Sequence, residues 1–181
     1  MRALVLYDRG TSEAGRVADA VAGGLPSGFS ARTLSFDDAT GSDLDGADLI
    51  VLGDGSRRMG PSRRLRDFLA RTDRASWRHR HVAVFETTND PNAWPTGPRA
   101  TATAAWLRRS GYRVARPVPC ASFLLAEPGG RLADAEPVRA ASWGLSLPTA
   151  AHVAITAGGD QGRSTDGQAD PTAVPGATER A

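Results

Sequence analysis

The spacing of hydrophobic residues changes once within the first 25 positions, from a continuous run to a helical repeat. Arg2 to Tyr7 reads RALVLY, a short apolar run of the kind found in strands buried on both faces. From Ala14 onward the apolar residues recur every three or four positions, which predicts a helix with one apolar stripe. The stripe consists of Ala14, Val17, Ala18, Val21, Ala22 and Leu25. The chain therefore begins with a strand, a short polar loop and a helix.

Strands and helices are expected to alternate along the rest of the chain. Residues 29–36 alternate apolar and polar side chains, as an edge strand does, whereas 49–53 and 82–85 are continuous apolar runs. We also expect a strand over 112–118 that Pro119 interrupts and 120–125 resumes, and helices that start at Pro61, near Ala102 and at Asp134. This alternation predicts an α/β fold, with a three-layer, doubly wound, five-stranded parallel sheet.

The last expected helix ends close to the point where the hydrophobic pattern stops. Val138, Ala141 and Leu145 are predicted to form its apolar face. Beyond it the chain is a mixture of glycine, proline, aspartate and threonine without periodicity or large apolar residues. We therefore expect a folded domain over residues 1–148 and a disordered tail over 149–181.

Composition narrows the class of protein. The 181 residues suffice for one domain, no apolar run approaches the ~20 residues that span a membrane, and the first residues lack the apolar length of a secretory signal. The single cysteine, Cys120, excludes an internal disulfide, favours a cytoplasmic location and is expected to be a buried structural thiol. All 22 basic residues are arginine, and the net charge of +2 is too small to predict a nucleic-acid partner.

The polar loop between the first strand and the first helix is the strongest candidate for chemistry. Asp8 to Glu13 are small, polar or hydroxyl-bearing, and they join the carboxyl end of a buried strand to a helix start. Free N–H groups and the positive end of the helix dipole make such a junction a site for phosphate.

Gly10 to Val17 also resembles the phosphate loop of nucleotide hydrolases. That class is disfavoured, because Arg16 replaces the lysine and Val17 the magnesium-binding hydroxyl.

The histidines do not predict a metal site. His79 and His81 flank Arg80 ahead of a predicted strand, two positions apart and without a cysteine or a third histidine nearby. That arrangement is typical of solvated loop histidines, so we expect no bound metal.

Several stretches together resemble the flavodoxin family. They are the strand that ends in Tyr7-Asp8 with its hydroxyl-bearing loop, residues 45–53 (DGADLIVLG), the helix start at Pro61-Ser62, and the strand 82–85. The resemblance covers residues 1–147 and implies a sheet of order 2-1-3-4-5. It also implies that flavin mononucleotide (FMN) lies across the carboxyl ends of the strands, where the first and third meet. The implied function is electron transfer or flavin-dependent reduction, with a possible protein redox partner.

The resemblance places the cofactor-binding residues on three loops. They are Asp8, Arg9, Gly10, Thr11, Ser12, Glu13 and Ala14 on the first loop, Asp54, Ser56, Arg57, Arg58 and Met59 on the second, and Thr87, Thr88, Asn89 and Trp94 on the third. The family's phosphate loop is similar to Thr/Ser-x-Thr-Gly-x-Thr, and Thr11 is the one hydroxyl that matches it. Arg9 and Arg16 supply positive charge that can hold a phosphate. The alternative is that the loop is a degenerate strand-to-helix turn.

The residue that stacks on the flavin ring is also different from the family's usual aromatic. On the second loop that position holds Arg58 or Met59, either of which can lie flat against a ring. Trp94 on the third loop is a replacement for the missing aromatic, or else it packs its loop against the sheet.

Two functions of different classes follow from these residues. One is an FMN-binding protein that transfers electrons or reduces a substrate, and the other is a flavodoxin-like binding or accessory module that has lost FMN. The loop chemistry decides between them, because function depends on the site and not on the fold. The sequence identifies no catalytic residue, and its ligand is expected to be a flavin or another anionic small molecule.

Overall fold

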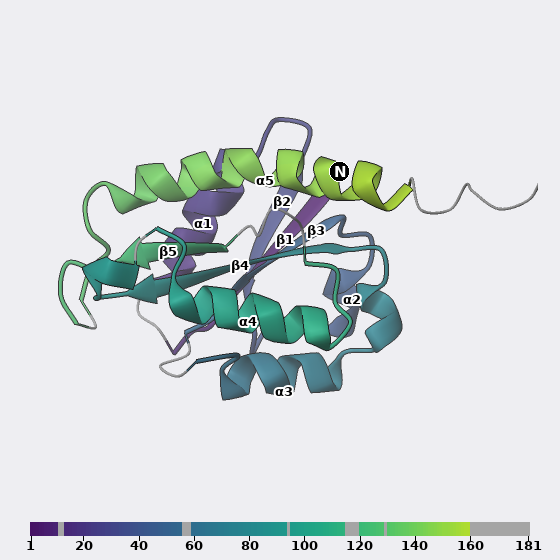
Figure 1. Cartoon of the computed structure of the whole chain (residues 1–181), viewed down its shortest axis with the longest axis horizontal. Helices are drawn as coiled ribbons and strands as arrows, with labels where there is room; N and C mark the ends of the chain where they lie inside the picture. The colour runs from purple at the N-terminus through teal and green to yellow at the C-terminus, as the bar shows by residue number, and fades with distance from the viewer. Residues whose placement is uncertain (11–12, 56–58, 94, 115–119, 129, 160–181) are drawn as a thin grey trace, which may run out of the picture.

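The chain folds around a five-stranded parallel sheet of strand order β2-β1-β3-β4-β5 (Figure 1). The computed structural model describes residues 1–10, 13–55, 59–93, 95–114, 120–128 and 130–159, with side chains described as far as Leu147. The strands are β1 (Arg2–Tyr7), β2 (Ser30–Ser35), β3 (Leu49–Gly53), β4 (His81–Thr88) and β5 (Cys120–Leu124). The helices are α1 (Ala14–Gly24), α2 (Gly41–Leu44), α3 (Arg63–Arg71), α4 (Pro98–Arg109) and α5 (Glu136–Gly159), with 3-10 turns η1 (Arg74–Trp77) and η2 (Pro91–Ala93). This architecture confirms the predicted fold class and sheet order.

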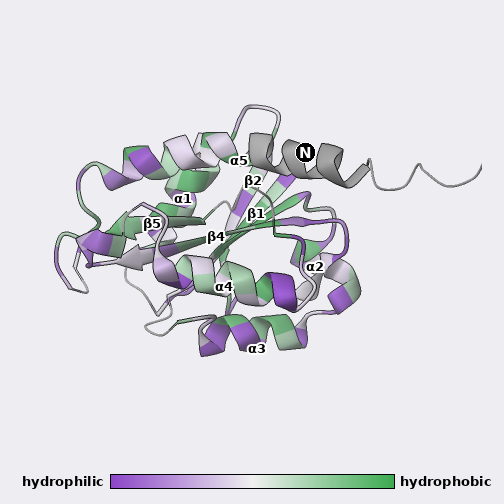
Figure 2. Cartoon of the chain, viewed as in Figure 1, coloured by the Kyte–Doolittle hydropathy of each residue, from purple (hydrophilic) through white to green (hydrophobic). Residues whose placement is uncertain are grey.

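Helices cover both faces of the sheet and divide the core in two. Leu4 and Leu6 of β1 belong to the core beneath α3 and α4, whereas Ala3 and Val5 belong to the core beneath α1 and α5. Successive strand residues point to opposite faces, so a strand buried on both sides is apolar at every position. Figure 2 shows apolar residues along the strands, with hydrophilic residues on the outer side of α3. Within the described residues, no helix combines the length and apolarity that crossing a bilayer requires.

The sheet order creates a switch point between β1 and β3. The chain leaves β1 for β2 on one side and returns to β3 on the other, so the loops after β1 and β3 diverge. Tyr7 pairs with Gly53 at this edge, and the backbone N–H of Asp8 donates to the Gly53 carbonyl at 2.9 Å. A Cβ at Gly53 would lie 2.2 Å from the Phe85 ring, so close packing with β4 requires glycine there.

The apolar face predicted for the last helix is wrong, whereas the stripe predicted for the first is right. Val138 and Leu145 are 71% and 59% exposed, and α5 instead packs against α1 through small residues. A Cβ at Gly144 would lie 2.3 Å from the Val21 carbonyl oxygen, and one at Gly24 would lie 2.0 Å from the Ala141 carbonyl oxygen. Close approach of the two helix backbones therefore selects the glycine-containing face of α5, which hydrophobicity alone did not indicate.

Other boundaries also differ from the expectations. The helix α5 continues to Gly159, so its last turns occupy the beginning of the tail expected over 149–181, and residues 160–181 lie outside the described residues. Of the strand expected over 112–118, Val114 forms an isolated bridge with Val82, and 115–119 lie outside the described part. His81 is not a solvated loop residue, because it begins β4 and is 6% exposed.

Cys120 begins β5 and is buried, as predicted for a structural thiol. Burial raises the pKa of this thiol to about 12. The thiolate, which is the reactive form, is therefore scarce at neutral pH, and a nucleophilic role is disfavoured.

Candidate functional site

The candidate site lies at the edge of the sheet where β1, β3 and β4 end. Because the strands are parallel, their carboxyl ends share this edge, and each continues into a loop that carries predicted cofactor residues. Asp8 follows β1, Asp54 follows β3, and Thr87 and Thr88 end β4. The fold thus brings the three predicted loops to one side of the molecule.

The start of α1 is the part of the site suited to an anion. Glu13 occupies the N-cap position, and within residues 1–10 and 13–55 no side-chain cap hydrogen bond is formed there. The first-turn N–H groups of α1 are donors that the helix itself cannot satisfy, and the helix dipole favours negative charge beside them. The Ala14 side chain at the first helical position is buried in the core, so the group it can offer a ligand is its backbone N–H.

Glu13 carries a negative charge next to the predicted phosphate site, and its carboxylate is already engaged by protein groups. Its Oε2 atom accepts a hydrogen bond from the Leu132 N–H at 3.2 Å and from Arg16 Nη1 at 3.1 Å. The side chain is 12% exposed. Arg16 therefore compensates the charge of Glu13, and the carboxylate joins the start of α1 to the segment after β5.

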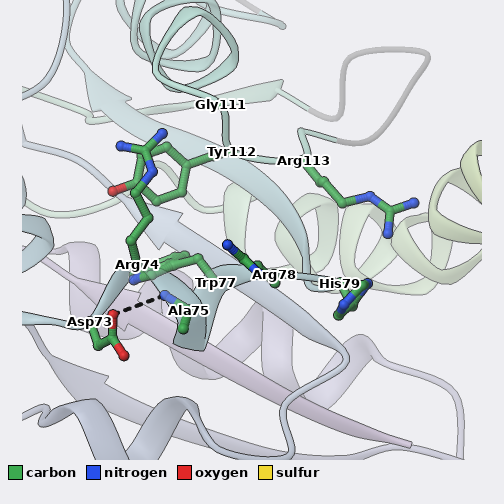
Figure 3. Close-up of a pocket in the computed structure, with 9 residues that line it drawn as sticks. All are labelled: Asp73, Arg74, Ala75, Trp77, Arg78, His79, Gly111, Tyr112 and Arg113. Atoms are coloured by element: carbon green, nitrogen blue, oxygen red, sulfur yellow. Dashed lines mark hydrogen bonds between the residues drawn. The ribbon is translucent and has the colours of Figure 1, made fainter.

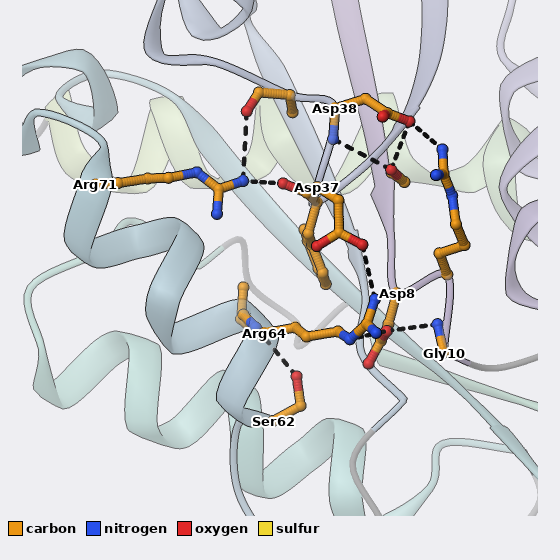
Figure 4. A network of polar contacts seen from close by, with 12 residues as sticks. Asp8, Gly10, Asp37, Asp38, Ser62, Arg64 and Arg71 are labelled. Carbon is orange, nitrogen blue, oxygen red and sulfur yellow. Dashed lines mark hydrogen bonds and ion pairs between the residues drawn. The ribbon is translucent and has the colours of Figure 1, made fainter.

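An ion-pair network braces the first loop (Figure 4). Asp8 accepts the Gly10 N–H at 2.8 Å, which closes a tight turn, and lies 3.6 Å from Arg64 Nε. Arg64 also contacts Asp37, with 2.7 Å between Nη1 and Oδ2. The backbone carbonyls of Phe36 and Ala39 accept from Arg71, which holds the segment after β2 against α3. The turn formed by Asp8 and Gly10 is therefore held by side chains from α3 and from the segment after β2.

Arg9 also forms an ion pair with the segment after β2. Its guanidinium pairs with Asp38, whose carboxylate also accepts from the Ser35 hydroxyl at 2.7 Å (Figure 4). The Arg9 and Asp38 side chains are 58% and 50% exposed. An ion pair at that exposure contributes about 0–1 kcal/mol, so it can be exchanged for a contact to a dianionic ligand. The role of Arg9 as a phosphate partner stays a prediction.

Asp54 is buried at the base of the second loop and faces protein groups. Its carboxylate accepts the Ser62 N–H at 3.0 Å and the Thr103 hydroxyl at 3.2 Å, and the Ser62 hydroxyl in turn caps α3. Burial raises the pKa of Asp54, and the nearby negative charge of Asp8 adds to the effect. Asp54 therefore joins the loop to α3 and α4 and supports the site from behind.

Glu86 lies near the carboxyl end of β4, beside the candidate site, and the sequence patterns did not point to it. It lies in β4, is 1% exposed, and accepts the Ala100 N–H in the first turn of α4. Arg99 Nε lies 3.5 Å from its Oε1, and burial raises its pKa. A Cβ at Gly97 would lie 2.6 Å from this carboxylate, and Gly97 has a φ of 68°. The buried glutamate thus caps α4 and fixes the end of the third loop.

The remaining predicted residues of the second and third loops differ in how far the structure describes them. Met59 is 69% exposed, which leaves its side chain free to contact a ligand. Thr88 is buried and its hydroxyl accepts the Asp90 N–H at 3.1 Å, whereas Asn89 is exposed and Thr87 is half-buried. Thr11, Ser12, Ser56, Arg57, Arg58 and Trp94 lie outside the described residues. Within the described part of the chain, no group of three metal-ligating side chains comes together.

Comparisons with known proteins agree with this architecture. An archaeal flavodoxin superposes with a TM-score of 0.62 at 22% identity, covering 84% of this chain and 99% of the flavodoxin. Flavodoxin 1 from Bacillus cereus gives a TM-score of 0.54 at 17% identity, covering 80% and 95% of the two chains. The flavodiiron protein from Giardia intestinalis gives 0.63 at 14% identity, covering 86% of this chain and 37% of its own.

These likenesses define the class of fold. No family model matches the sequence, and no curated protein matches it in sequence. At these identities the superpositions establish the fold alone, and the chain is an α/β protein of the flavodoxin-like fold.

Proposed function

We propose that the chain is an FMN-binding redox protein. The observation that carries the proposal is the start of α1, where no side chain of the described residues forms a cap hydrogen bond and which lies at the switch point between β1 and β3. This is the position at which a doubly wound sheet binds a nucleotide phosphate.

The proposal assigns the flavin phosphate to the first loop. The first-turn N–H groups of α1 and Arg9 would hold it together with Thr11 and Ser12, and Arg16 compensates the adjacent carboxylate of Glu13. Met59 and Trp94 are the residues proposed to contact the flavin ring, with Thr87 and Asn89 at its polar edge. When bound, FMN supplies a group that accepts and releases electrons singly or in pairs.

The protein's own contribution is to hold these loops in place. Asp8 closes the first loop onto Gly10, and Asp54 ties the second loop to the start of α3. Glu86 caps α4 and fixes the far end of the third loop. Binding groups on a fixed scaffold lose less entropy when a ligand arrives, which favours affinity.

A second function has one observation in its favour. Asp37 pairs with Arg64, Asp38 pairs with Arg9, and Asp8 and Asp54 add buried carboxylates at the same edge. Because carboxylates of the protein itself pair with Arg9 and Arg64, these arginines need no anionic ligand to balance their charge. Such a site suits a flavodoxin-like accessory module without FMN.

The absorption spectrum of the purified protein distinguishes the two functions. Absorption bands in the blue, retained after dialysis and released with FMN on denaturation, would support the flavoprotein. A colourless protein that stays colourless after incubation with excess FMN and gel filtration would refute it and favour the accessory module.

A further inference from the structure

A pocket lies at the opposite edge of the sheet, where β4 begins. It is enclosed by η1 and by the turn after α4, and its volume is about 520 Å³ (Figure 3). Pockets of a few hundred to a thousand cubic ångströms are the usual size of small-molecule sites. The amino and carboxyl ends of the strands are at different edges, so this pocket is separate from the candidate flavin site.

The pocket is lined with cationic side chains. Arg74, Arg78 and Arg113 line it with His79, and all four are exposed, while Asp73 contributes the one carboxylate. Asp73 accepts the Ala75 N–H at 3.0 Å. Across the described part of the chain, none of these three arginines is within ion-pair distance of a carboxylate. Arg9 and Arg64 at the flavin edge, by contrast, are both paired.

An aromatic pair, Trp77 and Tyr112, lies beside one of these cations, Arg74. Trp77 is buried and donates from Nε1 to the Thr72 hydroxyl at 3.1 Å. The Tyr112 ring meets Trp77 edge to face at 5.2 Å, and the Arg74 guanidinium lies 5.1 Å from the Tyr112 ring centre (Figure 3). The Arg74 guanidinium therefore lies against an aromatic pair, whose buried member Trp77 is held by a hydrogen bond.

The turn between η1 and β4 adds an independent sign of a functional site. His79 has a φ of 69°, a left-handed conformation that residues other than glycine rarely adopt. Such a conformation persists where the surrounding structure imposes it, and residues that adopt it are common at binding sites. His79 follows Arg78 shortly before the start of β4, and it lines the pocket.

We propose that this pocket binds a small polyanion that carries two or more adjacent phosphate groups. Three guanidinium groups without carboxylate partners outnumber the single aspartate, so an occupant with several negative charges balances the pocket. Guanidinium groups bind phosphate oxygens through paired hydrogen bonds, whereas a single carboxylate would engage one arginine and leave the others unpaired. The size of the cavity suits a small molecule rather than a nucleic-acid strand.

Isothermal titration of sodium tripolyphosphate into the full chain at low salt tests the proposal. Arg78→Gln and Arg113→Gln each remove one charge-assisted contact and should weaken binding about tenfold. The control is Arg66→Gln, which removes the same charge from the exposed surface of α3 and should leave the affinity within about twofold. Inorganic phosphate should bind more weakly than tripolyphosphate, and thermal melts of each variant verify that it folds.

Three results would overturn the proposal. One is the absence of tripolyphosphate binding to the unmutated chain. Another is an equal loss in the Arg66→Gln control, which would mean that binding follows overall charge. The third is affinity unchanged by Arg78→Gln and Arg113→Gln, which would assign these arginines another role.

Discussion

The contact between α1 and α5 predicts opposite effects for the same substitution at two glycines. At Gly144 an added Cβ would lie 2.3 Å from the Val21 carbonyl oxygen, a backbone atom that cannot rotate away. Overpacking of this kind costs about 1–3 kcal/mol, whereas alanine gains up to ~1 kcal/mol over glycine in a helix. Gly144→Ala should therefore lower the unfolding free energy by roughly 1–2 kcal/mol, a fall in Tm of about 2–8 °C.

Gly23 provides the matched control for this helix contact. It lies in the last turn of α1, and a Cβ there would meet no heavy atom within 4 Å. Gly23→Ala gains helix propensity without a clash and should raise Tm slightly. Thermal unfolding followed by circular dichroism measures both variants. If Gly144→Ala were as stable as Gly23→Ala, the backbones of α1 and α5 would not be in close contact and the reasoning would be refuted.

Three further predictions concern stability. Val21→Asp places an unpaired carboxylate at a fully buried position and should cost several kcal/mol, while Val138→Asp on the exposed face of α5 should cost little, as urea denaturation would show. Burial raises the pKa of Asp54 above its ordinary value of 3.8, so folding takes up a proton and stability falls as pH rises just above 3.8. Asp54→Asn should flatten that part of the stability–pH profile, and an unchanged slope would contradict the burial of this carboxyl. Removal of residues 149–181 should leave Tm unchanged if the domain ends at 148, and a drop of several degrees would extend the domain into the last turns of α5.

The sequence was sufficient for the first strand and helix because periodicity determined both. The continuous apolar run of β1 and the helical stripe that includes Val17 and Val21 are each visible from the spacing of apolar residues within the element itself. The sheet order came from the resemblance to flavodoxins, since periodicity does not specify which strands are adjacent.

The face of α5 could not be predicted because it depends on shape. Val138 and Leu145 are the large apolar residues, yet the contact with α1 requires the absence of a side chain at Gly144. Hydrophobic patterning ranks residues by apolarity and gives glycine no weight, so a helix face defined by close backbone contact is missed.

Sequence patterns also could not predict the hydrogen bonds and ion pairs that surround the site. Glu86 accepts from Ala100 and from Ser122, which are 14 and 36 positions away in the chain. The pairing of Arg9 with Asp38 likewise depends on where β2 lies beside β1. Loop composition indicated an anion site after β1, but the partners of each charge follow only from the tertiary structure.

The central claim is that FMN is held through its phosphate at the start of α1, and comparison with riboflavin tests it most directly. Fluorescence titration of the unmutated chain should show FMN binding at least about tenfold more tightly than riboflavin, which lacks the phosphate. Arg9→Ala should weaken FMN binding about tenfold to a hundredfold and riboflavin binding far less, because one charge-assisted hydrogen bond contributes roughly 1.5–3 kcal/mol. The control Arg32→Ala removes another exposed arginine that pairs with an aspartate and should change neither affinity. Equal affinities for the two ligands, or equal losses on Arg9→Ala, would contradict the phosphate site, and binding of neither ligand would contradict the flavin function itself.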